Sequence, residues 1–199
     1  MNTVTTTAAT AASDERTRWW SGAIAVGGCV LLAARPALLE FTRRPVPTLT
    51  LLFIALLVVG LSLPLPRLPR YVGANLGSLG PWAPGAIGIA AFALGRVIAG
   101  GRAPGAWSVA ILAANSLAAV AEEVWFRRVW FGLLEPAGTV FAVICSAVLF
   151  AAVHVAIYGV RILPLDIAAG LLLGWQRAAT GSWRVPALTH VAANLLVLL

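Results

Sequence analysis

The stretch Val109–Leu134, VAILAANSLAAVAEEVWFRRVWFGLL, most constrains what this chain can fold into. It is apolar over more than the roughly 20 residues that a helix needs to cross a bilayer. Near its centre it nevertheless carries the adjacent glutamates Glu122 and Glu123, followed by Arg127 and Arg128. Ionised side chains at that depth cost several kcal/mol unless they are paired or face a polar cavity, so they mark functional sites. The rest of the chain must therefore supply polar partners for these groups.

Composition indicates that the whole chain is an integral membrane protein. Of its 199 residues, 60% are hydrophobic and 11% are charged, whereas soluble domains carry about 25% charged residues. The net charge of +7 comes from fourteen arginines and no lysine. In a membrane protein such charges orient the spans rather than bind nucleic acid. The arginine- and alanine-rich usage is typical of a GC-rich bacterial genome. We therefore expect a multi-pass protein of the bacterial plasma membrane, surrounded by lipid.

The apolar segments predict an all-α bundle of about seven transmembrane helices (six to eight), with a polar site inside the bundle. Residues 1–18 are polar and lack periodicity, which predicts a mobile tail. Residues 19–105 form an N-terminal part without motifs, and residues 106–199 form the part that carries them. The arginine distribution favours a cytoplasmic N-terminus. The predicted spans are Trp19–Ala34, Thr48–Leu63, Gly85–Ile98, Val109–Leu134, Thr139–Tyr158, Ile162–Ala178 and Val185–Leu199.

Both histidines of the chain lie in predicted spans. His154 follows Phe150 by four residues, so the two share a helix face. His190 precedes Asn194 by four residues, so the imidazole and the carboxamide project together. A rise of about 1.5 Å per residue places these three polar groups and Glu122 roughly 12 to 23 Å from one membrane face, and a tilt of about 20° absorbs that scatter. We expect the four polar groups to meet from three helices.

Helix geometry separates the two glutamates. Glu123 and Arg127 have the i,i+4 spacing that suits an ion pair. Glu122 points about 100° away; its own i+4 residue, Phe126, has no charge, and Asn115 lies two turns earlier on the same face. We predict that Glu123 and Arg127 pair for structure and that Glu122 remains available for chemistry. The alternative is that both glutamates only pair with the neighbouring arginines.

Two further charged residues have less pronounced patterns. Asp166 lies near the start of a predicted span, two residues after Pro164, and an interfacial position is favoured over a role in the site. Arg128 is expected to reach the membrane surface or to pair with Glu135.

Three short motifs in the second half of the chain resemble those of a protease family. EEVWFR (Glu122–Arg127), FAAVH (Phe150–His154) and HVAAN (His190–Asn194) are similar to EExxxR, FxxxH and HxxxN, in the order found in the CPBP family of intramembrane proteases. That family includes CAAX-processing endopeptidases and bacteriocin-processing or immunity (Abi) proteins. The resemblance covers roughly residues 106–199. Arg128 departs from the family pattern, in which a small residue, often glycine, follows the first motif.

The resemblance implies hydrolysis of a peptide bond in a peptide or membrane-protein substrate, without a cofactor in the favoured version. Glu122 would act as general base on a water positioned with His154, while His190 and Asn194 donate to the oxyanion. The supporting residues would be Glu123, Arg127, Phe150 and Asn115. In the alternative version a zinc ion is held by His154, His190 and Glu122, although the chain has no HExxH motif.

Two other classes of function stay open. The polar cluster could serve helix packing or partner binding in a non-proteolytic membrane protein, such as a bacteriocin-immunity protein, because function depends on the site rather than the fold. It could also form a proton or ion pathway, but a relay does not require the asparagine beside His190. The sequence indicates neither a particular substrate nor an oligomeric state.

Overall fold

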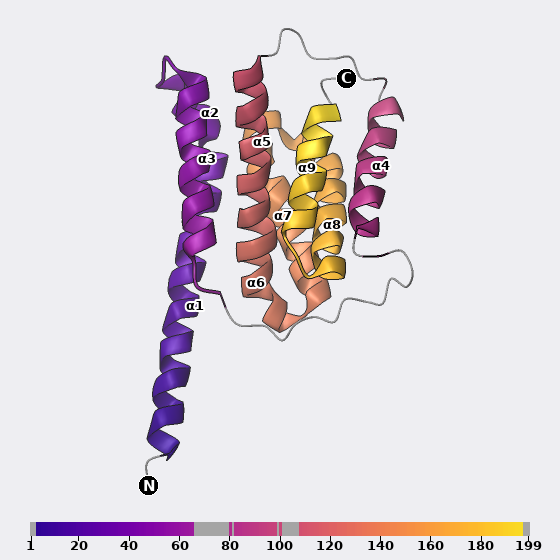
Figure 1. The fold of residues 1–199 in the computed structure, drawn as a ribbon. Coiled ribbons are helices and arrows are strands. Elements are labelled where there is room, and N and C mark those ends of the chain that lie inside the picture. Colours follow the sequence, from indigo (N-terminus) through magenta and orange to yellow (C-terminus); the bar gives the residue numbers. More distant parts are fainter. Residues whose placement is uncertain (1–2, 66–79, 81, 99, 101–107, 197–199) are drawn as a thin grey trace.

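A computed structural model describes residues 3–65, 80, 82–98, 100 and 108–196, with side chains described from residue 15 onward. These residues form mainly helices, and no strand occurs among them, so the predicted all-α bundle is confirmed (Figure 1). A π-helical segment, Val124–Trp130, joins α5 to α6. The α-helices are α1 (Thr3–Ala33), α2 (Arg35–Glu40), α3 (Pro45–Ser62), α4 (Ala83–Ile98), α5 (Val109–Glu123), α6 (Phe131–Leu134), α7 (Thr139–Tyr158), α8 (Leu163–Thr180) and α9 (Arg184–Leu196).

The described part of each predicted span is mostly helical, and the span Thr139–Tyr158 has the bounds of α7. The span Val109–Leu134 covers α5, the π-helical segment and α6, and residues 197–199 of the last span lie outside the described residues. Helix α1 begins at Thr3, so it includes most of the predicted tail, whose mobility stays a prediction. Most of the segments between predicted spans at residues 64–84 and 99–108 lie outside the described residues. Within the part of the chain that the structure describes, three helical stretches are long and apolar enough to cross a membrane, namely Pro45–Ser62, Val109–Ala137 and Thr139–Tyr158, and Ala83–Ile98 is a shorter apolar helix. The number of crossings and the orientation stay predictions.

Helix α5 lies at the centre of the bundle. It packs against α3 on one side and α9 on the other, while α4 packs along α9 (Figure 1). The most extensive contact joins α7 to α8. Gly170 permits it, because a Cβ atom at that position would lie 2.9 Å from the Ala147 Cα atom. This packing brings the motif-bearing faces of α5, α7 and α9 together.

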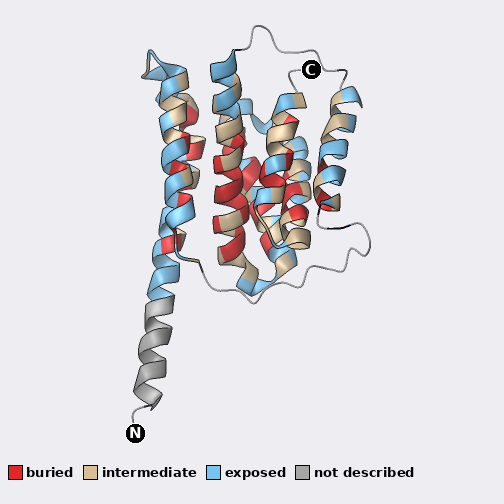
Figure 2. Ribbon diagram, viewed as in Figure 1, coloured by how far each residue is buried: buried red, intermediate tan, exposed pale blue. Residues whose placement is uncertain are grey.

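Burial is distributed as a lipid environment requires. Buried residues concentrate on the faces that α5, α7 and α9 turn toward one another (Figure 2). Glu122, Glu123 and Arg127 are all buried there, whereas apolar residues of α3 such as Leu51 and Val58 are 68% and 57% exposed. Apolar side chains on the outside cost nothing in hydrocarbon, and charged side chains inside can satisfy one another. The bundle therefore encloses these three charged side chains.

Candidate active site

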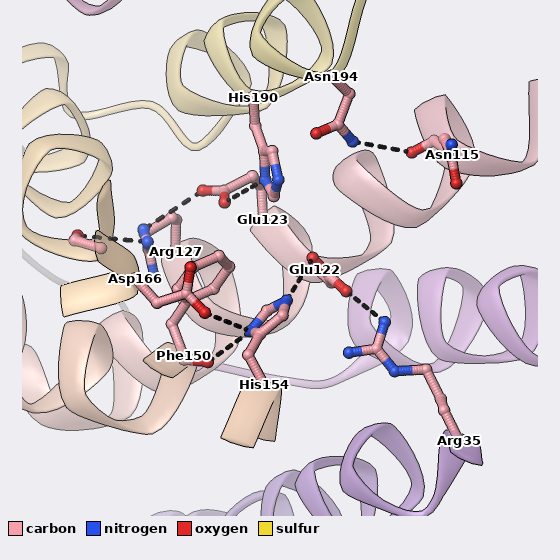
Figure 3. Close-up of polar contacts among 11 residues, drawn as sticks. Arg35, Asn115, Glu122, Glu123, Arg127, Phe150, His154, Asp166, His190 and Asn194 are labelled. Atoms are coloured by element: carbon pink, nitrogen blue, oxygen red, sulfur yellow. Dashed lines mark hydrogen bonds and ion pairs between the residues drawn. The ribbon is translucent and has the colours of Figure 1, made fainter. Parts of the chain in front are cut away.

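Glu122 is the central group of the polar cluster. Its carboxylate is 4% exposed and has different neighbours at its two oxygens. Oε1 accepts a hydrogen bond from Nη1 of Arg35 at 2.8 Å. Oε2 lies 3.8 Å from Nε2 of His154, too far for a direct hydrogen bond (Figure 3). One oxygen is thus held by a cation, and the other faces an imidazole across a short gap.

His154 has its tautomer set by its own helix. Its Nδ1 lies 2.7 Å from the backbone carbonyl of Phe150, one turn earlier in α7. Because a carbonyl oxygen can only accept, Nδ1 carries the proton. In the neutral ring Nε2 therefore has a lone pair, and this is the nitrogen that faces Glu122. Oδ2 of Asp166 lies 3.8 Å from Nδ1 on the other side of the ring.

Glu123 contacts both an arginine and a histidine, although only the arginine was expected as its partner. Its Oε2 lies 3.3 Å from Nε of Arg127, which confirms the predicted i,i+4 pair. Its Oε1 accepts from Nδ1 of His190 at 3.0 Å. Arg127 is fully buried; its Nη2 donates to the Gly170 carbonyl at 3.3 Å, and its guanidinium lies 5.2 Å from the Phe150 ring centre. Glu123 therefore anchors α9 as well as the segment after α5.

Asn194 and Phe150 complete the cluster. The Nδ2 amide of Asn194 donates to the backbone carbonyl of Asn115 at 3.4 Å, a contact that uses one of its two amide hydrogens. The Phe150 ring lies 4.5 Å from the ring of His154 and 5.8 Å from that of His190, measured between centroids. Phe150 thus fills the space between the two imidazoles. Asn115 contributes its backbone rather than its side chain to this contact.

A change in helix type follows the two glutamates directly. The expected regular α-helix over residues 109–134 instead changes to a π-helix at Val124 and returns to α-helix at Phe131. Widened π turns occur often at functional sites, where they re-aim side chains. Here the widened segment carries Phe126 and Arg127, which are both fully buried.

The polar side chains line one cavity of about 770 Å³. Glu122, His154, His190 and Asn194 all line it, so the expected meeting of these four groups from three helices is confirmed. Apolar residues make up much of the remaining wall. The other charged residues of the wall are Arg35, Arg96 and Asp166.

Three charged residues have partners that the sequence did not indicate. Glu122 was expected to remain available for chemistry because its own helix offers it no charge, and in the structure it pairs with Arg35. Asp166 was expected at the membrane interface, but it lines the cavity beside His154.

Arg128 donates to the backbone carbonyls of Gly60 and Leu63, and Glu135 lies instead 3.9 Å from Nη2 of Arg177. In each of the three cases the partner comes from another helix. Helix periodicity indicates only the neighbours within one helix.

Sequence reasoning missed Arg35 altogether. Arg35 and Pro36 mark the end of the first apolar span, and a charged residue at such a place is usually interfacial. No motif or spacing links it to Glu122, which comes 87 residues later.

A zinc site requires several ligands placed around one point. Within the described ranges, no group of three or more His, Cys, Asp or Glu residues is placed to hold a metal ion. Nδ1 of His190 is engaged by Glu123, and Oε1 of Glu122 is engaged by the Arg35 cation. Histidines that donate one ring nitrogen to a carboxylate or a backbone carbonyl occur at zinc sites, but a cation on Glu122 opposes the binding of a metal ion by that carboxylate.

Residues 104–196 match the family model of type II CAAX prenyl endopeptidase Rce1-like proteins. This part of the chain, just under half of its 199 residues, is similar to the Rce1-like family. The Rce1-like segment runs from just before α5 to the end of α9 and includes all three motifs, but not Arg35. Comparisons with curated proteins and with solved structures gave no match. The match to the Rce1-like family supports a CAAX-type endopeptidase in general, and together with the three apolar helices found among the described residues it supports an integral membrane protein.

Proposed function

We propose that this protein is a metal-independent intramembrane endopeptidase in which Glu122 is the general base. The observation that carries the proposal is the placement of Glu122 Oε2 opposite His154 Nε2, 3.8 Å apart on the wall of the cavity. Both atoms are hydrogen-bond acceptors in the forms described above. A water within hydrogen-bond distance of both would donate one hydrogen to each, which turns its lone pair toward a bound peptide carbonyl.

The first chemical step follows from this arrangement. The water oxygen forms a bond to the carbonyl carbon as one of its protons passes to Glu122, and the carbonyl oxygen takes the negative charge. Glu122 then gives that proton to the leaving nitrogen as the carbon–nitrogen bond breaks. The products are a carboxylic acid and an amine, and the site returns to its starting state.

His190 and Asn194 are the proposed donors to the oxyanion. Nδ1 of His190 donates to Glu123, so Nε2 can donate to an oxyanion only when the ring is an imidazolium. The negative charge of Glu123 stabilises that form, which gives this buried glutamate a role in the reaction. Asn194 uses one amide hydrogen on the Asn115 carbonyl. Its second amide hydrogen can serve the oxyanion.

The substrate class is a peptide or membrane protein whose scissile bond reaches the cavity from the bilayer. In a bacterium, peptide precursors and membrane proteins suit this description better than the prenylated proteins cut by eukaryotic family members. The bacterial plasma membrane, and a path that crosses it several times, belong to the same proposal. A zinc-dependent reaction and a non-proteolytic immunity protein are the alternatives.

The test compares peptides from cells that express wild type, Glu122→Gln or Glu40→Gln at equal levels. Glu40 is an exposed glutamate of α2, so its substitution is the matched control. We expect fragments that appear with wild type and Glu40→Gln and are missing with Glu122→Gln, although all three proteins melt at similar temperatures. Identical peptides from all three would contradict proteolysis and favour the immunity function. Melting of Glu122→Gln well below wild type would indicate a structural cluster.

A further inference from the structure

Arg35 brings a cation into the site from outside the Rce1-like segment. It is the first residue of α2, it is 9% exposed, and it lines the same cavity as Glu122 and His154. Its Nη1 donates to Glu122 Oε1 at 2.8 Å. The N-terminal helices, which carry no motif, therefore touch the proposed general base directly.

The guanidinium of Arg35 is itself held in place. Its Nε donates to the backbone carbonyl of Leu32 at 2.7 Å, and its central carbon lies 5.5 Å from the Phe53 ring centre. These contacts come from α1 and α3. Nη2 is buried and makes no hydrogen bond within the described part of the chain. Arg35 therefore contacts Glu122 through a single hydrogen bond, from Nη1 to Oε1. Oε2 is left facing His154 (Figure 3).

Charge explains why this contact matters for a base. A carboxylate removed from water tends to take up a proton, and a protonated carboxyl cannot accept one from the attacking water. A guanidinium at hydrogen-bond distance stabilises the ionised form. Asp166 acts in the opposite direction, since a second carboxylate disfavours ionisation. The titratable and charged groups around Glu122 are Arg35 on α2, Arg127 after α5, His154 and Tyr158 on α7, Asp166 on α8 and His190 on α9.

We propose that Arg35 is a positioning residue for the reaction. It keeps Glu122 ionised and turned so that Oε2 faces His154. This inference rests on the proposed function, because it concerns the same carboxylate. It also means that the motif-bearing helices alone lack a part of the site, and that the start of α2 contributes to activity.

The test reads the ionisation of Glu122 without a substrate. Infrared spectra of the detergent-solubilised full chain are recorded across a pH series, and the carbonyl band of protonated Glu122 is assigned by its loss in Glu122→Gln. In Arg35→Gln we expect this band to appear at higher pH than in wild type, because the carboxylate has lost its cation. Arg43→Gln, at an exposed position after α2, is the matched control and should leave the band unchanged. A band that titrates alike in Arg35→Gln and wild type would overturn the proposal.

A second variant separates charge from orientation. Arg35→Lys keeps a cation but not the planar geometry that matches a carboxylate. We expect the Glu122 carbonyl band of Arg35→Lys to titrate at nearly the same pH as in wild type. Release of the fragments that wild type produces should fall about 10-fold. This is less than the roughly 100- to 10,000-fold loss expected on removal of a general base. Wild-type release by Arg35→Lys would overturn the orienting role, and this holds even if Arg35→Gln does not fold. If Glu122→Gln itself releases fragments like wild type, the proposed function is wrong, whatever the Arg35 variants show.

Discussion

Nδ1 of His190 lies 3.0 Å from Oε1 of Glu123. The second glutamate of the EEVWFR motif therefore reaches the HVAAN motif, while the first faces the FAAVH motif and Arg35. Two adjacent glutamates thus serve opposite sides of one cavity. Glu122 faces the proposed attacking water, and Glu123 faces the proposed oxyanion donor. The 100° between successive helix residues is what allows this division.

Glu123→Gln should lower cleavage mainly at alkaline pH. Without the negative charge the imidazolium of His190 is less stable, so its donor proton is lost at lower pH than in wild type. The alkaline limb of the pH–activity profile should therefore move to lower pH, and the acidic limb, set by Glu122, should stay. The measurement is fragment release across pH, with Glu40→Gln as control. An unchanged alkaline limb would contradict the role given to Glu123.

Asn194→Ala should reduce cleavage about 100- to 1,000-fold, the effect of losing one oxyanion donor. The loss should appear in kcat rather than KM, because the contact forms in the transition state. Asn115→Ala is the matched control: Asn194 contacts the Asn115 backbone carbonyl, which this substitution keeps. Steady-state kinetics on the peptide identified from wild-type cells would measure both. Equal losses in the two variants would point to helix packing instead.

Gly170→Ala should destabilise the bundle by about 1–3 kcal/mol, as overpacking of a close contact does. The added Cβ would lie 2.9 Å from the Ala147 Cα atom, and backbone cannot move aside as a flexible side chain can. Gly27→Ala in α1 is the control, because no atom lies within 4 Å of its added Cβ. The midpoint of denaturant-induced unfolding would be compared for the three proteins. A midpoint for Gly170→Ala equal to wild type would show that α7 and α8 separate easily.

Chelation should leave cleavage unchanged. If Glu122 acts on water without a metal, prolonged treatment with EDTA or phenanthroline followed by gel filtration removes nothing that the reaction needs. Fragment release and metal content would be measured on the same samples, with a zinc protease treated in parallel. Loss of activity that added zinc restores would establish the zinc alternative.

The sequence by itself determined the class of the protein and the members of its motifs. Runs of apolar residues long enough for a bilayer predict helices, and the spacing of four residues places Phe150 with His154, and His190 with Asn194, on shared faces. The same spacing predicts the Glu123–Arg127 pair, which the structure contains. These inferences succeed because each depends on geometry within a single helix.

Only the tertiary structure decided which helices pack together and which polar contacts join them. The contacts of Arg35 with Glu122, of Asp166 with His154 and of His190 with Glu123 each join two helices. The rotation and depth of one helix against another depend on packing, as at Gly170 against Ala147, and on the π-helical segment after Glu123. Neither leaves a periodic signal in the sequence. Arg35 therefore resembles an interfacial arginine in the sequence and is a partner of the proposed base in the fold.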